Sequence, residues 1–408
     1  MAGERLAQDD LAEVLGFTPT DEQWAVASMP LQPAVVVAGA GSGKTTSMAA
    51  RVAWLVGSGL VAADEVLGLT FTTKAAAQLL ASMRRSVGAL EVAAEAGVEP
   101  AEPTVLTYNA FGARLLSEHG IRLGREPGAP VLTNGARQQL AYRVVCRSTL
   151  PLGVLRASPA AITADLLSLD DELSELAVEP EQLVAFDDEQ VRVLRGYDAL
   201  QTVGRTLLET SEARRVLARL VGEWRAAKAD RDVLDFADQI RLAGELVAQF
   251  PDVVDDYRRR FRVVLLDEYQ DTSISQRLLL QRLFGDAHPV LAVGDPCQAI
   301  YGWRGASVHN IDHFGEHFAR GSDGGHGGDV PSLRLTQCRR CAPSILEVAN
   351  RVAEPLRQAH PSVGRLDYGG TASDRGRVAC ALFETYDAEI DWVVGEIQRT
   401  RSGARGRD

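Results

Sequence analysis

Short runs of apolar, largely β-branched residues punctuate the chain, and each ends in a polar or glycine-rich turn. They lie at 34–37, 66–70, 104–107, 263–266 and 290–293. Apolar residues at helical spacing separate most of these runs, as at 46–56 and 74–87. Short, nearly continuous apolar strands between helices indicate a parallel sheet that is covered on both faces. The pattern therefore predicts a doubly wound α/β core.

The region from about residue 111 to 228 has a different pattern. It is rich in Ala, Leu, Arg and Glu, and its apolar residues recur at helical spacing, as Val193, Tyr197 and Leu200 do. No run in this region has the character of a strand. We therefore expect an all-helical insertion between strands of the core.

The remainder of the chain begins with a glycine-rich stretch. Residues 320–330, RGSDGGHGGDV, have the composition of a flexible linker. Beyond the linker we expect a strand at 333–335 and a helix at 343–353. The terminal RTRSGARGRD, residues 399–408, has the composition of a disordered basic tail.

Size and charge limit what the chain can be. Its 408 residues predict two or three domains. A net charge of −12 argues against a general basic surface for DNA, but it leaves room for a local track. The stretch 170–189 holds nine carboxylates and no Lys or Arg, so we do not expect it to face a phosphate backbone. Because no apolar run reaches ~18 residues and the N-terminus is acidic, we expect a cytoplasmic protein without a membrane partner.

Two residue types are used sparingly. Lysine occurs only at 44, 74 and 228, and two of these positions fall inside motifs described below, which indicates sites that need an ammonium group. The five cysteines are scattered, which predicts free thiols. Cys338 and Cys341 have C-x-x-C spacing, so a metal or redox site is an alternative to plain buried thiols. A zinc site needs about four ligands, and no second pair follows.

The segment 38–45, AGAGSGKT, carries the first candidate chemistry. It follows a predicted strand and opens a predicted helix, which is the context of a P-loop and argues against a chance glycine-rich turn. Its glycines let several N–H groups point at one anion, and the helix N-terminus adds a positive dipole end. Lys44 would reach the β- and γ-phosphates of ATP, and the Thr45 hydroxyl would bind Mg²⁺. The expected cradle comprises Ala38, Gly39, Ala40, Gly41, Ser42, Gly43, Lys44, Thr45 and Thr46.

A pair of carboxylates, Asp267 and Glu268, ends the predicted strand at 263–266. Four apolar residues before Asp-Glu are a weak pattern alone, but together with a P-loop they become a specific one. Asp267 would hold Mg²⁺ through water, and Glu268 would orient and deprotonate the attacking water. Adjacent carboxylates at a buried strand end repel each other without a cation, which argues against a purely structural role.

Several longer segments resemble the UvrD/Rep/PcrA helicases of superfamily one. In the family's order, they are PTDEQ (19–23), TFTTKAAA (70–77), LDFAD (234–238), DEYQDT (267–272), VGDPCQAIYGWRGA (293–306) and LTQCRR (335–340). The resemblance implies an ATP- and Mg²⁺-dependent motor on single- and double-stranded DNA. It further implies 3′-to-5′ polarity and a role in repair or recombination.

The resemblance also implies a domain organisation. The sheet would be a RecA-like P-loop NTPase domain made of residues 1–107 and 231–320, with the helical insertion at 108–230. Residues 321–330 would be the linker. Residues 331–408 would begin a second RecA-like domain and end in the disordered tail.

Three polar residues receive nucleotide-site roles from the resemblance. Gln23 would recognise the edge of adenine, since its amide can both donate and accept hydrogen bonds. Gln298 would sense the γ-phosphate. Arg340 would reach the γ-phosphate from the second motor domain and stabilise transition-state charge.

Three aromatic residues receive a nucleic-acid role. Phe71, Tyr301 and Trp303 would stack on unpaired bases, an interaction that tolerates any sequence. Core packing is the alternative for Tyr301 and Trp303 when the residues are considered without the resemblance.

Four positions depart from the family's pattern. Thr46 stands where relatives often carry an arginine beside adenine, and Arg339 stands where an aromatic often stacks on the base. Because of these two departures, the sequence does not determine which residues contact adenine, although a flat guanidinium at 339 can also stack on the base. Asn109 replaces a usual His, and Gln78 replaces a usual Glu.

The family's motifs V and VI have no match after Arg351, so we expect the N-terminal part of a longer helicase or a truncated product. LTFTTKAAAQL (69–79), TYNAFGARLLSEHG (107–120) and REPGAP (125–130) are similar to segments of actinobacterial helicase–nuclease subunits of the AdnB type, which implies a helicase–nuclease partner subunit. An ATP- and DNA-binding module that does not translocate is one alternative. A P-loop kinase is another, against which Gln298, Tyr301 and Trp303 argue.

Overall fold

The computed structural model describes residues 5–91, 101–319, 330–371 and 375–404. At its centre lies a six-stranded sheet with the order β3-β2-β4-β5-β1-β6. The strands are β1 (Ala34–Ala38), β2 (Val66–Thr70), β3 (Thr104–Thr107), β4 (Val263–Leu266), β5 (Val290–Gly294) and β6 (Ser332–Leu335). Every neighbouring pair is parallel, which confirms the α/β class predicted from the apolar runs.

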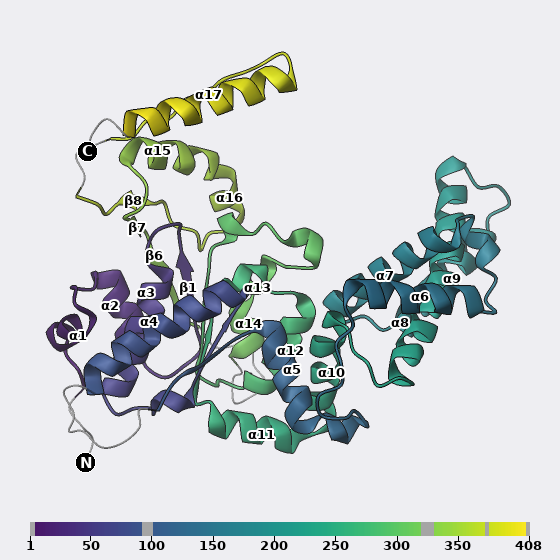
Figure 1. Ribbon diagram of the computed structural model, residues 1–408, viewed down its shortest axis with the longest axis horizontal. Coiled ribbons are helices and arrows are strands. Elements are labelled where there is room, and N and C mark those ends of the chain that lie inside the picture. Colours follow the sequence, from purple (N-terminus) through teal and green to yellow (C-terminus); the bar gives the residue numbers. More distant parts are fainter. Residues whose placement is uncertain (1–4, 92–100, 320–329, 372–374, 405–408) are drawn as a thin grey trace.

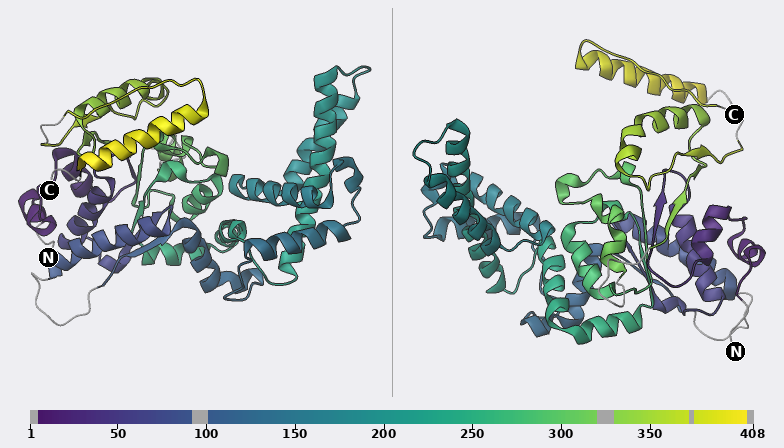
Figure 2. Two further views of the ribbon diagram at one scale, coloured as in Figure 1. Left: turned by 45° about the horizontal axis from the view of Figure 1, so that its top comes forward. Right: turned by 180° about the vertical axis from the view of Figure 1, so that it is seen from behind.

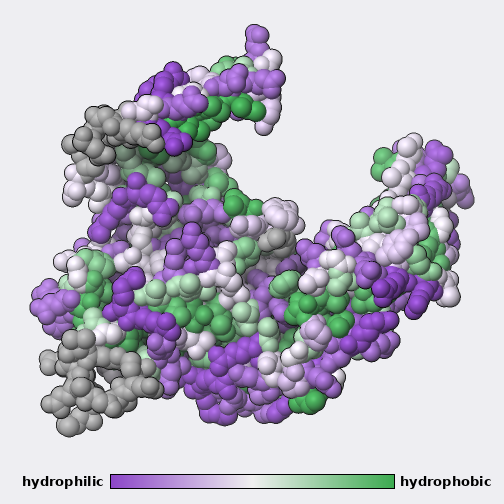
Figure 3. All heavy atoms as spheres, in the orientation of Figure 1, coloured by the Kyte–Doolittle hydropathy of each residue, from purple (hydrophilic) through white to green (hydrophobic). Residues whose placement is uncertain are grey.

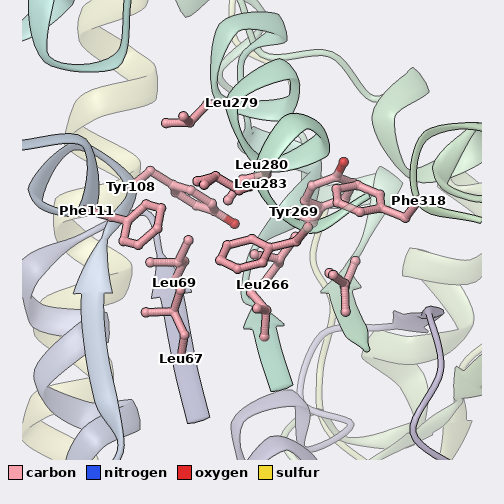
Figure 4. Close-up of a cluster of buried hydrophobic side chains, with 14 of the residues drawn as sticks. Leu67, Leu69, Tyr108, Phe111, Leu266, Tyr269, Leu279, Leu280, Leu283 and Phe318 are labelled. Atoms are coloured by element: carbon pink, nitrogen blue, oxygen red, sulfur yellow. The ribbon is translucent and has the colours of Figure 1, made fainter. Parts of the chain in front are cut away.

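Helices cover both faces of this sheet (Figure 1). Successive strand residues point to opposite sides, so Val35 and Val37 of β1 join one core while Ala34 and Val36 join the other. The Val36 side is covered by α1 (Gln8–Leu15), α2 (Asp21–Ser28), α3 (Lys44–Gly57) and α4 (Thr73–Glu91). The Val35 side is covered by α5 (Tyr108–His119), α10 (Phe236–Gln249), α11 (Pro251–Arg260), α12 (Ile274–Phe284), α13 (His309–Asp312) and α14 (Phe314–Phe318). Figure 4 shows aromatic and leucine side chains of the Val35-side core gathered above the strand ends.

The helical insertion projects away from the sheet (Figures 1 and 2). It consists of α6 (Asn134–Arg147), α7 (Pro159–Leu176), α8 (Pro180–Arg195) and α9 (Thr202–Ala229), with a core of its own around Trp224, Leu166 and Leu220. The described residues between 111 and 228 contain no strand beyond an isolated bridge of Val131 with Leu234. This confirms the all-helical insertion.

The prediction that Val193, Tyr197 and Leu200 follow one helical periodicity was wrong. α8 ends at Arg195 with Gly196 at its C-cap, and Tyr197 is 63 % exposed in the turn that follows. Val193, Tyr197 and Leu200 therefore do not share a helical face, because the glycine ends the helix between the first and the second of them.

The boundary expected at 330/331 also needs correction. β6 pairs with β1, with Leu333 opposite Val36, and Leu335 is fully buried in the core on the Val36 side. The described chain therefore leaves the first sheet only after Leu335, since apolar residues of β6 complete that sheet. The expected linker, apart from Val330, lies outside the described residues.

The last part of the described chain forms a separate small unit. It contains a two-stranded sheet of β7 (Gln337–Cys338) and β8 (Asp367–Tyr368), and the helices α15 (Pro343–Val352), α16 (Glu354–Ala359) and α17 (Tyr386–Ala404). The expected disorder of the tail is wrong for 399–404, which continue α17 with an ion pair of 2.6 Å between Glu396 and Arg399. Residues 405–408 lie outside the described part.

The surface of this small unit includes apolar side chains along α15 and α17 (Figure 3). The half-exposed residues there are Ile345, Val348, Ile390, Val393, Val394 and Ile397. Among the described helices, none is long and apolar enough to cross a membrane.

Candidate nucleotide site and nucleic-acid groove

A tightly curled loop connects β1 to α3. Gly41 and Gly43 have φ angles of 73° and 92°, in the left-handed region that favours glycine. The backbone N and the Oγ of Ser42 both donate to the carbonyl of Gly39, at 3.2 and 2.8 Å. The chain then enters α3 at Lys44, so the first N–H groups of a 14-residue helix lie at the loop. This is the backbone arrangement that binds phosphate.

The start of the small C-terminal unit lies directly against this loop. The N–H of Arg339 donates to the carbonyl of Gly41 at 3.1 Å. A Cβ on Gly41 would lie 2.6 Å from the Cβ of Arg340, so only glycine permits this approach. The structure thus brings Arg340 beside the cradle, with its side chain exposed.

Gln23 also lies at the cradle. It is 5 % exposed, and a Cβ on Gly43 would be 2.7 Å from its Nε2. Its Oε1 accepts a hydrogen bond from the N–H of Thr20 at 3.1 Å and so caps α2. The nitrogen of the amide therefore faces the loop, whereas one lone pair of the oxygen is already used. Thr45 is exposed and Thr46 is half-buried in the first turn of α3.

An ion pair joins the cradle to the end of β4. Nζ of Lys44 lies 2.7 Å from Oε2 of Glu268. Glu268 has a φ of 49°, a left-handed conformation that costs a non-glycine residue on the order of 1–3 kcal/mol. This reversal ends β4 and begins the 3-10 turn η4 (Tyr269–Asp271). The predicted phosphate-binding lysine and the predicted base are thus brought together.

Asp267 lies at the buried end of β4. Its Oδ2 accepts a hydrogen bond from Oγ1 of Thr70 at 3.3 Å, while its Oδ1 is buried and has no hydrogen-bond partner among the described residues. Burial, followed by the charge of Glu268, raises the pKa of Asp267 to about 6. A divalent cation would relieve both effects, so the residues present fit a Mg²⁺ site.

Gln298 and the three predicted aromatics lie at the same edge of the sheet. Gln298 ends η5 (Pro296–Gln298), and its Nε2 donates to Oδ2 of Asp295 at 2.6 Å. The Tyr301 ring lies 4.7 Å from the ring of Phe71 and 6.4 Å from that of Trp303. Trp303 is 75 % exposed, so core packing does not explain it.

A groove of about 980 Å³ lies between two of these aromatics, Phe71 and Trp303, and the insertion. Its lining includes Phe71, Asn109, Arg137, Asp171, Glu172, Glu175, Asp235, Phe236, Asp271, Gln276 and Trp303. Three of the carboxylates come from α7, within the acidic stretch 170–189. That stretch therefore lines the groove, whereas its charge had led us to expect it away from any nucleic-acid track.

A buried charge cluster under the groove escaped the sequence analysis. Nζ of Lys228 lies 2.9 Å from Oδ2 of Asp235, 2.7 Å from Oδ2 of Asp238 and 3.4 Å from Oδ2 of Asp170. All four side chains are at most 3 % exposed. Arg137 extends the cluster to the groove wall by pairing with Asp235 and with Asp171. The rarity of lysine was the one signal that could have singled out Lys228.

The other positions noted in the sequence have ordinary surroundings. Oδ1 of Asn109 accepts a hydrogen bond from Nε2 of Gln276 at 3.3 Å. All five cysteines are free thiols, with Cys338 buried and Cys341 half-buried. The described residues hold no group of three or more His, Cys, Asp or Glu side chains that could bind an ion.

A curled glycine loop between β1 and α3, facing two carboxylates at the end of β4, defines a P-loop nucleotide-binding protein with a RecA-type parallel sheet. Residues 19–319 match the family model described as the UvrD/REP helicase N-terminal domain. The chain belongs to this family.

The chain is also similar to curated proteins that are named DNA helicases. The chain is 29 % identical to ATP-dependent DNA helicase UvrD1 of Mycobacterium leprae over 78 % of its own length and 37 % of that protein's. It is 28 % identical to DNA helicase II of Escherichia coli, over 82 % of the chain and 40 % of the relative. It is 29 % identical to ATP-dependent DNA helicase UvrD2 of Mycobacterium tuberculosis, over 83 % and 43 %. The chain thus spans about two fifths of the length of these relatives.

Proposed function

We propose that this chain is the ATP-hydrolysing part of a DNA helicase, which couples ATP turnover to movement along single-stranded DNA. The observation that carries the proposal is the Lys44–Glu268 contact of 2.7 Å, which joins the cradle to the carboxylate pair. The names of the relatives, all DNA helicases, support the same reading. We further propose 3′-to-5′ polarity, a role in repair or recombination, and action in the cytoplasm, where a helicase–nuclease subunit would be its partner.

Each residue of the site would have its own role in ATP binding or hydrolysis. The cradle from Ala38 to Thr46 would bind the phosphates of ATP, and Gln23 would contact the base. Thr45 and Asp267 would hold Mg²⁺, which screens phosphate charge when it is bound. Glu268 would orient the attacking water and accept its proton. Gln298 and Arg340 would respond to the γ-phosphate.

The groove would bind the nucleic acid through its bases. Phe71, Tyr301 and Trp303 offer aromatic faces, and each base stacked on such a face contributes ~1–3 kcal/mol. The opposite wall carries Glu172 and Glu175 of α7, whose carboxylates would repel phosphates, whereas Asp171 beside them is paired with Arg137. We infer that the bases enter the groove between the aromatics and α7, while the phosphate backbone stays outside.

ATP turnover with and without single-stranded DNA tests the proposal. We expect DNA to stimulate turnover, and Lys44→Ala to abolish it in both conditions. Arg84→Ala is the control, since its ion pair with Glu102 is half-exposed and lies outside the site. Tight binding of ATP and DNA without turnover would instead identify a non-translocating module. Turnover that ignores DNA would favour a small-molecule kinase.

A further inference from the structure

Gln270 occupies a position between the nucleotide site and the aromatic groove. It lies in η4, just after the carboxylate pair, and is 1 % exposed. Its backbone and side chain lie against Gly294 at the end of the neighbouring strand β5. The residue therefore bridges the carboxyl ends of two adjacent strands, β4 and β5.

The side-chain amide of Gln270 makes hydrogen bonds in both directions. Its Nε2 donates to Oε2 of Glu268 at 2.9 Å and to Oδ2 of Asp271 at 3.2 Å. Its Oε1 accepts from the backbone N–H of Asp295 at 3.0 Å. Both N–H donors are therefore used, and the oxygen ties the same group to β5.

The amide packs closely against Gly294. A Cβ on Gly294 would lie 2.6 Å from Oε1 of Gln270 and 3.2 Å from its backbone N. Any residue larger than glycine at 294 would displace the amide. Because an amide is planar and rigid, a shift of its nitrogen also shifts its oxygen.

The amide is the middle of a continuous chain of contacts. On one side, Oε2 of Glu268 is shared between Gln270 and Nζ of Lys44. On the other side, Asp295 accepts a hydrogen bond from Gln298 at 2.6 Å. Three residues further along the chain, the ring of Tyr301 packs against that of Phe71 at a tilt of 35°. Lys44 and the groove aromatics are thereby linked through polar contacts and one short loop.

We propose that Gln270 is a positioning residue that couples the nucleotide site to the nucleic-acid groove. This rests on the proposed function and deepens it. Lys44 and Gln270 both donate to Oε2 of Glu268. If nucleotide binding draws Lys44 away from that oxygen, the position of the Glu268 carboxylate changes, and with it the hydrogen bond from Gln270. The amide passes that change to Asp295 and Gln298. Coupling between two sites typically changes affinity by about 5–150-fold, and it is reciprocal.

Affinity for DNA, measured with and without nucleotide, tests the coupling. Fluorescence anisotropy of a labelled oligothymidylate would be recorded on the full chain without nucleotide, with Mg²⁺ and a non-hydrolysable ATP analogue, and with Mg²⁺ and ADP. In the wild type we expect the analogue to change DNA affinity by at least about 5-fold relative to no nucleotide. In Gln270→Met we expect this ratio to fall toward one, while the affinity for each ligand alone stays within about 3-fold of wild type.

Two further variants secure the result. Gln239→Met replaces another buried glutamine, on α10 and outside the site, and should keep the wild-type ratio. Gln270→Glu keeps an oxygen that accepts from the Asp295 N–H but loses the two amide donors. It should therefore uncouple the sites as well. If Gln270→Met does not fold, Gln270→Glu takes its place in the test.

The outcomes are distinct. A wild-type ratio in a folded Gln270 variant overturns the role of Gln270 and leaves the proposed function standing. A wild-type protein whose DNA affinity ignores nucleotide overturns the coupling, and the proposed function is overturned as well only if DNA also fails to stimulate ATP turnover.

Discussion

The rings of Phe71 and Tyr301 lie 4.7 Å apart with an interplanar angle of 35°, although 230 residues separate them in the chain. Phe71 follows β2 and Tyr301 follows η5, so the contact depends on the carboxyl ends of parallel strands lying at one edge of the sheet. Phe71 lines the groove together with Trp303, opposite residues of α7, and Tyr301 packs behind it. A single aromatic surface thus arises from two motifs that the sequence places far apart.

Phe71→Ala tests whether this pair binds bases. Removing the ring should weaken binding of single-stranded DNA by about 5–150-fold, which corresponds to ~1–3 kcal/mol of stacking. Nucleotide affinity without DNA should not change, because the ring of Phe71 packs on Tyr301 and lines the groove. Anisotropy titrations with an oligonucleotide measure the first quantity, and titrations with a fluorescent ATP analogue measure the second. Phe186→Ala, which removes an exposed ring on α8, is the matched control. Equal losses in the two variants would sink the stacking role.

Glu268→Gln tests the role of the base. The amide retains an oxygen that can accept from Lys44, but it cannot take a proton from water. The turnover number should therefore fall about 10²–10⁴-fold while nucleotide affinity stays near that of the wild type. Glu65→Gln, at an exposed pair with Arg262, is the control and should keep full turnover. A variant that loses nucleotide binding along with turnover would show that Glu268 acts by positioning the cradle.

The sheet could be predicted from the sequence because each of its first five strands is a short apolar run bounded by turn residues. Four of these strands are fully buried and consist almost entirely of apolar residues, and the half-buried β3 has an apolar centre between two threonines, so the pattern can be read locally. β6 was assigned to the wrong unit because its place depends on pairing with β1, nearly 300 residues earlier, and no local pattern encodes a strand's neighbour. The helical end of α17 was missed because composition indicated disorder, whereas the Glu396–Arg399 ion pair supports the helix there.

The site was predictable to the extent that its geometry is local. The P-loop curls because of glycines that can be read directly, and the carboxylates follow a buried strand. Gln270 was not singled out, since its importance comes from β4 and β5 lying side by side. The partners of Lys228 could not be read either, because Asp170 reaches it from a helix 58 residues away.

Asp267→Asn should stabilise the protein while it removes the proposed metal ligand. The pKa of Asp267 is raised by burial and by the charge of Glu268 from its ordinary value near 4 to about 6. A raised pKa means that the folded state binds the proton more tightly than the unfolded state does. The buried carboxylate therefore lowers stability above about pH 6, and this penalty disappears as the pH falls through 6 toward 4. A shift of about 2 pKa units corresponds to ~3 kcal/mol.

Urea unfolding in metal-free buffer measures this penalty. The Asn variant should exceed the wild type by ~3 kcal/mol at pH 7.5, and the difference should shrink to less than ~1 kcal/mol at pH 4. Mg²⁺ should stabilise the wild type alone, because under the proposal the cation would bind the folded state through this carboxylate. An Asn variant that is less stable than the wild type at pH 7.5 would contradict the sign of the shift.

Lys228→Met tests the buried cluster that joins α9 and α7 of the insertion to α10 of the core. Without the ammonium, Asp170, Asp235 and Asp238 would lose a shared partner in a site closed to water. Removing one member of a buried ion pair typically costs ~3–5 kcal/mol. Lys74→Met, at an exposed lysine, should change stability by less than about 0.5 kcal/mol.

Trp224 reports on the cluster directly. Its ring centroid lies 4.9 Å from Nζ of Lys228, and its Nε1 donates to Asp170 at 2.8 Å. Urea unfolding followed by tryptophan emission should show a lower midpoint in Lys228→Met. DNA affinity should also fall in the fraction that stays folded, since Arg137 and Asp235 connect the cluster to the groove wall. If the midpoint is unchanged, the cluster does not hold the insertion on the core. If the midpoint falls but DNA affinity does not, the cluster stabilises the joint without shaping the groove.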